Sequence, residues 1–216
     1  VWDNYPYPVF NDRYYSSNDF IATISKVTSD IVQTVSPGTD ERYIPHAVDQ
    51  RIYRKVPKDV ISKMLERNHF LKDKTVFFWN NRNARRKQTG SLIYWFKTFL
   101  EHPEVDRDKV CLMIHSDPND PHGQPIQYLQ DSLGFGPGEI ILSTNKLPAN
   151  ELALLYNVAT CTINISDAEG FGLATLESLS CGTPIIVNMT GGLQEQVTDG
   201  TKWFGVGITP SSKAVI

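Results

Sequence analysis

From residue 75 onward, short apolar runs alternate with segments in which apolar residues recur every three or four positions. The apolar runs, which have the length and continuity of buried strands, are 75–79, 110–114, 140–142, 161–166 and 185–187. The segment after the first run places Leu92, Ile93 and Phe96 on one helical stripe, and comparable stripes follow the later runs. Repeats of a continuously apolar strand and an amphipathic helix predict an α/β fold, a Rossmann-like doubly wound parallel sheet with helices on both faces.

Glycine and asparagine residues predict where these helices begin and end. Gly134 and Gly182 follow the stripes at 126–133 and 173–179, where a left-handed residue commonly ends a helix. Asn150 precedes the helix between the third and fourth strands and is predicted to cap it. Ligands of doubly wound sheets bind outside the carboxyl ends of the strands, so the loops after the apolar runs are the candidate binding region.

The first 48 residues do not share this alternation. They open with an aromatic and proline-rich stretch at 2–8, and a strand or helix is expected around 20–24. We interpret residues 1–48 as the tail of a preceding domain with its linker, and residues 49–216 as a Rossmann-like domain that is truncated at its C-terminal end. A helix is expected within 56–71.

Composition changes this interpretation little. The chain of 216 residues is 40% hydrophobic with a formal net charge of −3, so it has no basic field that would favour nucleic acid. No apolar run approaches the roughly 20 residues that cross a bilayer, and the first residues do not resemble a signal peptide. The widely spaced Cys111, Cys161 and Cys181 indicate reduced, buried thiols, and hence a cytoplasmic protein. The acidic pair at 106–108 is interpreted as a polar turn, and no metal site is expected.

The segment 167–177 holds the most informative chemistry, because it follows a strand and opens a helix. Gly170 and Gly172 permit positive φ angles and a close backbone approach to a ligand. The free amides of a helix start attract a diphosphate. Glu169 and Glu177 lie eight positions apart, which is roughly 12 Å along a helix. Two carboxylates at that separation are expected to accept hydroxyls at opposite ends of a nucleotide sugar.

Cations that would balance these acids follow the first strand. Arg82 and Lys87 stand after 75–79, at the sheet edge where ligands bind, and suit phosphate oxygens. The neighbouring Arg85 and Arg86 are interpreted as surface residues. His115 ends the second strand at the same edge and is a candidate donor contact.

The ordered set of motifs resembles family 4 glycosyltransferases, which have two Rossmann-like domains in the type B architecture. The E-x7-E pattern of Glu169 and Glu177 continues into 178–195, and the segments 44–49 and 82–87 resemble the interdomain segment and the basic strand end of that family. The resemblance implies transfer of a hexose from a UDP- or GDP-sugar with retention of configuration, and without an essential metal or cofactor. The acceptor, whether glycan, lipid or small molecule, would bind mainly in the preceding domain, and membrane association of a longer protein stays open.

The resemblance also implies roles for particular residues. Glu169 would contact the transferred sugar, and Arg82 and Lys87 would neutralise the leaving diphosphate. The other implied donor contacts are Gly170, Phe171, Gly172, Leu173, Thr175, Glu177, Asn145, Lys146, Leu147 and His115. The chain departs from the pattern at Asn81 and Gln88, which replace glycines, and at 46–47; asparagine tolerates an unusual backbone better than most residues.

Two alternatives remain at this point. A phosphorylase or nucleotide-sugar epimerase has the same architecture, although no pyridoxal-binding lysine motif is visible in the sequence. A non-catalytic binding or assembly module would keep the fold and lack the activity.

Overall fold

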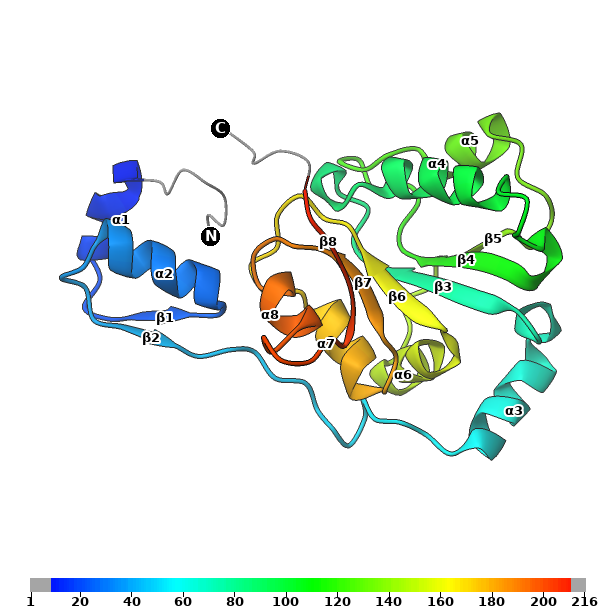
Figure 1. Ribbon diagram of the computed structural model, residues 1–216, viewed down its shortest axis with the longest axis horizontal. Coiled ribbons are helices and arrows are strands. Elements are labelled where there is room, and N and C mark those ends of the chain that lie inside the picture. Colours follow the sequence, from blue (N-terminus) through cyan, green and yellow to red (C-terminus); the bar gives the residue numbers. More distant parts are fainter. Residues whose placement is uncertain (1–8, 211–216) are drawn as a thin grey trace.

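The computed structural model describes residues 9–210, so the aromatic stretch at 2–8 lies outside the described part (Figure 1). Its main element is a parallel sheet of six strands in the order β5-β4-β3-β6-β7-β8. These strands are β3 (Thr75–Asn80), β4 (Val110–His115), β5 (Ile140–Ser143), β6 (Cys161–Asn164), β7 (Ile185–Asn188) and β8 (Gly205–Ile208). The predicted doubly wound α/β fold is therefore confirmed.

The strand order reverses between β3 and β6, because the chain leaves β5 at one edge and re-enters the sheet on the other side of β3. Loops that leave adjacent strands in opposite directions at such a point open a crevice at the carboxyl end of the sheet. The segments 81–88 and 165–172, which follow β3 and β6, border this crevice.

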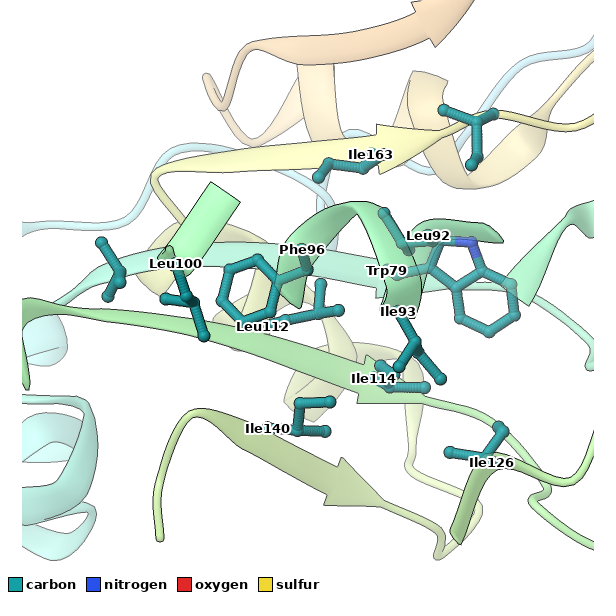
Figure 2. Close-up of a cluster of buried hydrophobic side chains, with 12 residues drawn as sticks. Trp79, Leu92, Ile93, Phe96, Leu100, Leu112, Ile114, Ile126, Ile140 and Ile163 are labelled. Atoms are coloured by element: carbon teal, nitrogen blue, oxygen red, sulfur yellow. The ribbon is translucent and has the colours of Figure 1, made fainter. Parts of the chain in front are cut away.

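Helices cover both faces of the sheet (Figure 1). One face carries α4 (Thr89–Leu100) and α5 (Ile126–Ser132), and the other carries α3 (Lys58–Arg67), α6 (Ala149–Val158) and α7 (Leu173–Ser180). Figure 2 shows Trp79, Leu112 and Ile114 of the sheet facing the buried side of α4. The alternate residues Phe78, Cys111 and Met113 pack on the opposite face with α6. Burial on both faces explains why these strands have no polar alternation.

Two details of the sequence prediction were wrong. β8 was not predicted, because Gly205 and Gly207 interrupt its apolar pattern; a Cβ at Gly205 would lie 1.8 Å from the Ile185 carbonyl oxygen, so the close strand pairing requires glycine. Asn150 does not cap α6, which begins at Ala149 after the extended residue Pro148. The expected left-handed residues beyond α5 and α7 are present, with φ of 63° at Gly134 and 80° at Gly182.

Residues 9–43 form a small separate layer, called here the N-terminal unit (Figure 1). It pairs β1 (Ile21–Thr23) in parallel with β2 (Glu41–Tyr43), and α2 (Lys26–Val35) packs on both strands; the short α1 (Asp12–Ser16) precedes them. The element expected around 20–24 is therefore a strand. An extended segment, 44–52, connects this unit to the rest of the chain (Figure 1).

Candidate functional site

A cavity of about 310 Å³ lies at the crevice where the strand order reverses. Its lining residues come from both bordering loops, from the start of α7 and from the N-terminal side of the chain: Ile24, His46, Asn81, Lys87, Glu169, Phe171, Gly172, Leu173 and Ala174. Asn81 Nδ2 is buried and has no hydrogen-bond partner within residues 9–210. A buried amide of this kind is a donor that a ligand in the cavity can satisfy.

The central feature of the cavity is a buried ion pair between Lys87 Nζ and Glu169 Oε1. Each residue is only 7% exposed. Burial alone would raise the pKa of Glu169, but the Lys87 ammonium and several hydrogen bonds hold that pKa below its ordinary value. Burial lowers the pKa of Lys87, against the attraction of Glu169. The structure thus brings two of the three predicted catalytic residues into direct contact.

Residues of β6 and its loop position the Glu169 carboxylate. Asn164 Nδ2 donates to Glu169 Oε1 at 3.2 Å, and the Ser166 hydroxyl lies 3.3 Å from the same oxygen. Ser166 also bonds Asn164 Oδ1 through its hydroxyl, at 2.6 Å. Sequence reasoning missed both residues, although a signal was present: Thr162, Asn164 and Ser166 are polar at alternate positions of an apolar run.

The two glycines of the site loop, Gly170 and Gly172, differ in backbone conformation. Gly172 has φ of 93°, and a Cβ there would lie 2.6 Å from Leu193 Cδ2. Gly170 does not have a positive φ, so the left-handed conformation that glycine permits is used at Gly172 and not at Gly170; a Cβ at Gly170 would lie 3.4 Å from Ile24 Cδ1. The left-handed backbone that we considered for Asn81 occurs at Gln88, with φ of 58° immediately before α4.

Helix α7 begins at Leu173, four residues after Glu169. The separation estimated from helical spacing therefore does not apply to Glu169 and Glu177, because the loop must first turn through Gly172. Gly172 occupies the position before the helix, and within residues 9–210 no side-chain cap bonds the amides of the first turn from that position. Leu173 lines the cavity, whereas Thr175 is fully buried.

The buried Thr175 is not part of the cavity wall, and its hydrogen bonds stabilise the site loop. Its hydroxyl lies 2.7 Å from the Gly172 carbonyl oxygen and 2.6 Å from Gln196 Oε1. Gln196 in turn donates from Nε2 to the Phe171 carbonyl oxygen at 2.6 Å. The loop is therefore held in place by Thr175 and Gln196, which do not line the cavity.

Glu177 does not line this cavity, and within residues 9–210 no cation forms an ion pair or hydrogen bond with it. Its Oε2 accepts a hydrogen bond from the Tyr156 hydroxyl at 2.7 Å, and Tyr156 accepts one from Asn80 Nδ2 at 2.7 Å. Burial raises the pKa of Glu177, although the hydrogen bonds from Tyr156 and Tyr53 act in the opposite direction. This carboxylate lies beneath the end of β3, between α6 and α7.

Arg82 follows β3 at the expected edge but does not contact Glu169 directly. Its Nε lies 2.6 Å from Asp120 Oδ2, and its side chain is 64% exposed. Arg86, which we interpreted as a surface residue, is half exposed and also approaches Glu169, with Nη1 3.4 Å from Oε2. Within residues 9–210, the cations that form ion pairs with Glu169 are therefore Lys87 and Arg86.

The remaining predicted donor contacts lie on the side of β4 and β5. His115 ends β4, and its Nδ1 lies 2.9 Å from Ser143 Oγ; burial lowers its pKa. Asn145 and Lys146 are exposed in the loop after β5, and Leu147 packs against the core below α6. None of these four residues lines the cavity around Glu169.

Residues 63–214 match a family model described as glycosyl transferases group 1. The chain belongs to this family. The resemblance inferred from the motif order is thereby confirmed. Within residues 9–210, no helix is both long and apolar enough to cross a bilayer, and no cluster of three or more metal-binding side chains occurs.

Curated glycosyltransferases align with much of the chain. It is 29% identical over 171 residues to D-inositol 3-phosphate glycosyltransferase 1 of Catenulispora acidiphila, covering 78% of this chain and 38% of that protein. It is 27% identical over 196 residues to a GDP-mannose-dependent alpha-(1-6)-phosphatidylinositol monomannoside mannosyltransferase of Mycolicibacterium smegmatis, covering 87% of this chain and 49% of that protein. The chain thus spans about half or less of the length of these relatives.

Solved glycosyltransferase structures share the fold. A sucrose-phosphate synthase from Thermosynechococcus elongatus superposes with a TM-score of 0.75 at 21% identity, covering 94% of this chain and 48% of that one. Anabaena HepE, solved in complex with UDP and glucose, superposes with a TM-score of 0.73 at 18% identity, covering 94% and 54%.

Proposed function

We propose that this chain is the donor-binding part of a retaining glycosyltransferase that transfers a hexose from a UDP- or GDP-sugar. The observation that carries the proposal is the buried Lys87–Glu169 pair, facing a cavity at the sheet's reversal point beside an uncapped helix start. Burying two charges is unfavourable for stability unless they are well paired, so their retention at a ligand-binding edge favours a functional role. The related HepE was solved with UDP and glucose, and the Mycolicibacterium smegmatis relative is named as GDP-mannose-dependent.

In this proposal the cations bind the diphosphate of the donor, and the carboxylate binds its sugar. Lys87 supplies the positive charge that the leaving diphosphate needs as its bond to the sugar breaks, and Arg82 adds a second cation from the same loop. Glu169, held ionised, accepts hydroxyls of the transferred sugar. The amides of Gly170, Phe171 and the first turn of α7 face the phosphates.

The other residues complete the donor contacts. Leu173 contributes the cavity wall, while Gly172 and Thr175 shape the loop. Glu177, with its raised proton affinity, accepts the ribose hydroxyls beside Tyr156. The base lies toward His115 and the loop of residues 145–147. Cations and amides of the chain provide the charge stabilisation, so we propose that no metal or cofactor takes part.

The proposed division of the chain follows the relatives' greater length. Residues 1–48 would be the tail of an acceptor domain with its linker, and residues 49–216 the donor domain. The chain on its own is then expected to bind donor without efficient transfer, and the acceptor, whether glycan, lipid or small molecule, would bind mainly to the other domain. The three buried free thiols favour a cytoplasmic location.

Calorimetric titration tests the proposal directly. UDP, GDP and ADP, and UDP-glucose and GDP-mannose, are added to the folded chain, with UMP and GMP to isolate the contribution of the second phosphate. We expect one diphosphate series to bind and Glu169→Gln to weaken the sugar-bearing ligand more than the free diphosphate. A folded sample that binds none of them at millimolar concentration would contradict the proposal.

Thermal unfolding gives an independent measurement on the same samples. A ligand at 100 times its dissociation constant stabilises the native state by about 2.7 kcal/mol. The test variant is Lys87→Met, and Arg85→Met is its matched control, because Arg85 is an exposed cation of the same loop. We expect the stabilisation by nucleotide to persist in the Arg85 variant and to be lost in the Lys87 variant.

A further inference from the structure

The short helix α8 (Leu193–Val197) contacts two different parts of the molecule through adjacent side chains. Glu195 reaches the N-terminal unit: its Oε2 accepts a hydrogen bond from the Lys26 backbone amide at 2.8 Å, and its Oε1 accepts one from the Tyr43 hydroxyl at 3.0 Å. Gln196 reaches the site loop, donating to the carbonyl oxygens of Phe171 and Gly172 at 2.6 and 3.2 Å. One helix therefore joins the N-terminal unit to the loop that borders the cavity.

The contacts of Glu195 have a clear physical basis. Lys26 is the first residue of α2, so its amide has no partner within that helix, and a carboxylate there also interacts favourably with the helix dipole. Burial and the nearby carboxylate raise the pKa of Tyr43 to about 12, so the phenol keeps its proton and remains a donor. Both oxygens of Glu195 thus hold the same unit, one through α2 and one through β2.

The consequence is visible in the cavity wall. Ile24 and His46, which precede the large sheet in the sequence, line the cavity together with Lys87 and Glu169. The His46 ring meets the Phe171 ring edge-on, with centroids 5.2 Å apart, and Ile24 Cδ1 lies over Gly170. Ile24 belongs to the N-terminal unit and His46 to the segment that follows it, so this part of the cavity wall depends on where the N-terminal unit lies.

We propose that Glu195 is a positioning residue that holds the N-terminal unit over the cavity, while Gln196 sets the site loop beneath it. The proposal rests on the proposed donor site for its second consequence, which is that donor binding and the placement of the N-terminal unit stabilise each other. Such linkage is reciprocal: whatever loosens the unit weakens donor binding, and the donor tightens the unit.

The test measures inter-unit distance and donor affinity in the same chain. Spin labels are attached through Asp30→Cys on α2 and Tyr128→Cys on α5, two exposed positions, while the native cysteines are buried. The variants are Glu195→Ala, Glu195→Gln and Tyr43→Phe. Glu66→Ala, an exposed glutamate of α3, is the matched control.

We expect the label distance to broaden in Glu195→Ala, to broaden less in Tyr43→Phe, and to remain unchanged in the Glu66 control. The dissociation constants for UDP-glucose or GDP-mannose are expected to rise about five-fold or more in Glu195→Ala, within the usual range for linked sites. The same ligand should narrow the label distance distribution of the doubly labelled chain that keeps Glu195 and Tyr43. If the distribution is unchanged in Glu195→Ala, or if it broadens while affinity stays the same, the proposal is wrong.

Failure of the donor proposal remains distinguishable. If the unmodified chain binds no nucleotide, the proposed function fails, while the ligand-free distances still test the role of Glu195. Should Glu195→Ala unfold, Glu195→Gln and Tyr43→Phe remove part of the same contacts and carry the same expectation with a smaller change.

Discussion

Glu169 and Glu177 belong to one sequence motif, yet the structure surrounds them with opposite environments. Glu169 lies beside two cations and is held ionised, with its pKa below the ordinary value. Glu177 lies beside the phenols of Tyr156 and Tyr53, with its pKa raised by burial. The pKa values of two glutamates eight positions apart are thus shifted in opposite directions, because their neighbours differ.

This difference separates two kinds of recognition. A charged ligand can replace one partner of a buried ion pair. The ammonium of Lys87 can then bind a diphosphate oxygen, and the carboxylate of Glu169 can accept sugar hydroxyls. A carboxylate hydrogen-bonded to neutral phenols offers acceptor oxygens without demanding a cation. In the proposed function, this contrast separates the Lys87–Glu169 pair, which would meet the diphosphate and the transferred sugar, from Glu177, which would accept the ribose hydroxyls.

The largest change in stability is expected when Lys87, the cation paired with Glu169, is replaced. Lys87→Met leaves a buried carboxylate without its main partner, so we expect the free energy of unfolding in urea to fall by about 3–5 kcal/mol. Arg85→Met, at an exposed position of the same loop, is expected to stay within about 0.5 kcal/mol.

A double variant shows whether the loss comes from the unpaired charge. Lys87→Met combined with Glu169→Leu replaces both charges with apolar groups, and should recover most of the stability without recovering donor binding. If the double variant is as unstable as Lys87→Met alone, the buried charge is not the cause.

The corresponding test at Glu177 is expected to give a smaller effect. Tyr156→Phe removes the donor to Glu177 and the acceptor of Asn80, both part-buried, and should lower the free energy of unfolding by about 1–3 kcal/mol. Tyr128→Phe, whose residue is 68% exposed, is the control and should change little. If Tyr156→Phe lowers the free energy of unfolding more than Lys87→Met does, the surroundings of Glu177 contribute more to stability than those of Glu169, contrary to the prediction.

Glu169 and Glu177 are expected to change the pH dependence of stability in opposite directions. Glu169 has a lowered pKa, so the stability it contributes is present above its unfolded value, near pH 4.3, and is lost as pH falls through the folded value. For Glu177 the raised pKa has the opposite effect: the folded state holds the proton more tightly, and stability falls as pH rises between the two values.

Urea unfolding between pH 3 and 7 checks these signs. Glu169→Gln should flatten the acid loss of stability, by at most about 1.4 kcal/mol per pH unit for one proton, and Glu177→Gln should steepen it. A Glu169→Gln variant with the same pH profile as the unmodified chain would exclude an ionised, stabilised Glu169.

The smallest expected stability effect is at the pair of Arg82 and Asp120, in which the Arg82 side chain is 64% exposed and the Asp120 side chain is 8% exposed. Asp120→Asn should cost less than about 1 kcal/mol, because solvent screens the exposed guanidinium and the amide keeps an acceptor oxygen for it. Arg82→Gln should likewise leave stability nearly unchanged while weakening UDP or GDP binding in calorimetry. Unchanged affinity would remove Arg82 from the proposed phosphate contacts.

Much of the fold could be predicted because its signals are local. Continuous apolar strands, helical stripes and the glycines at 134 and 182 indicate a two-sided parallel sheet without any tertiary knowledge. β8 escaped prediction because its glycines serve a close approach to β7, which no local pattern reveals. The start of α6 was misplaced because Pro148 and Asn150 are both compatible with a helix beginning, and only the backbone decides between them.

The candidate site was predictable in its residue types and less so in its contacts. The motif order identified Lys87 and Glu169, which the fold brings together across 82 positions of sequence. It did not identify Asn164, Ser166 or Tyr156, whose roles depend on which side chains face them across the sheet. Nor could it show that Asp120 accepts a hydrogen bond from Arg82.

The sequence by itself determined the α/β class and the family, because these follow from periodicity and from the order of short motifs; the donor contacts that it predicts remain a proposal. Only the tertiary structure decided which carboxylate is paired with a cation, which glycine is left-handed, and that Glu195 connects the N-terminal unit to the body. The physical reason is that charge state and contact depend on burial and on neighbours distant in the chain, which are properties of the packed molecule.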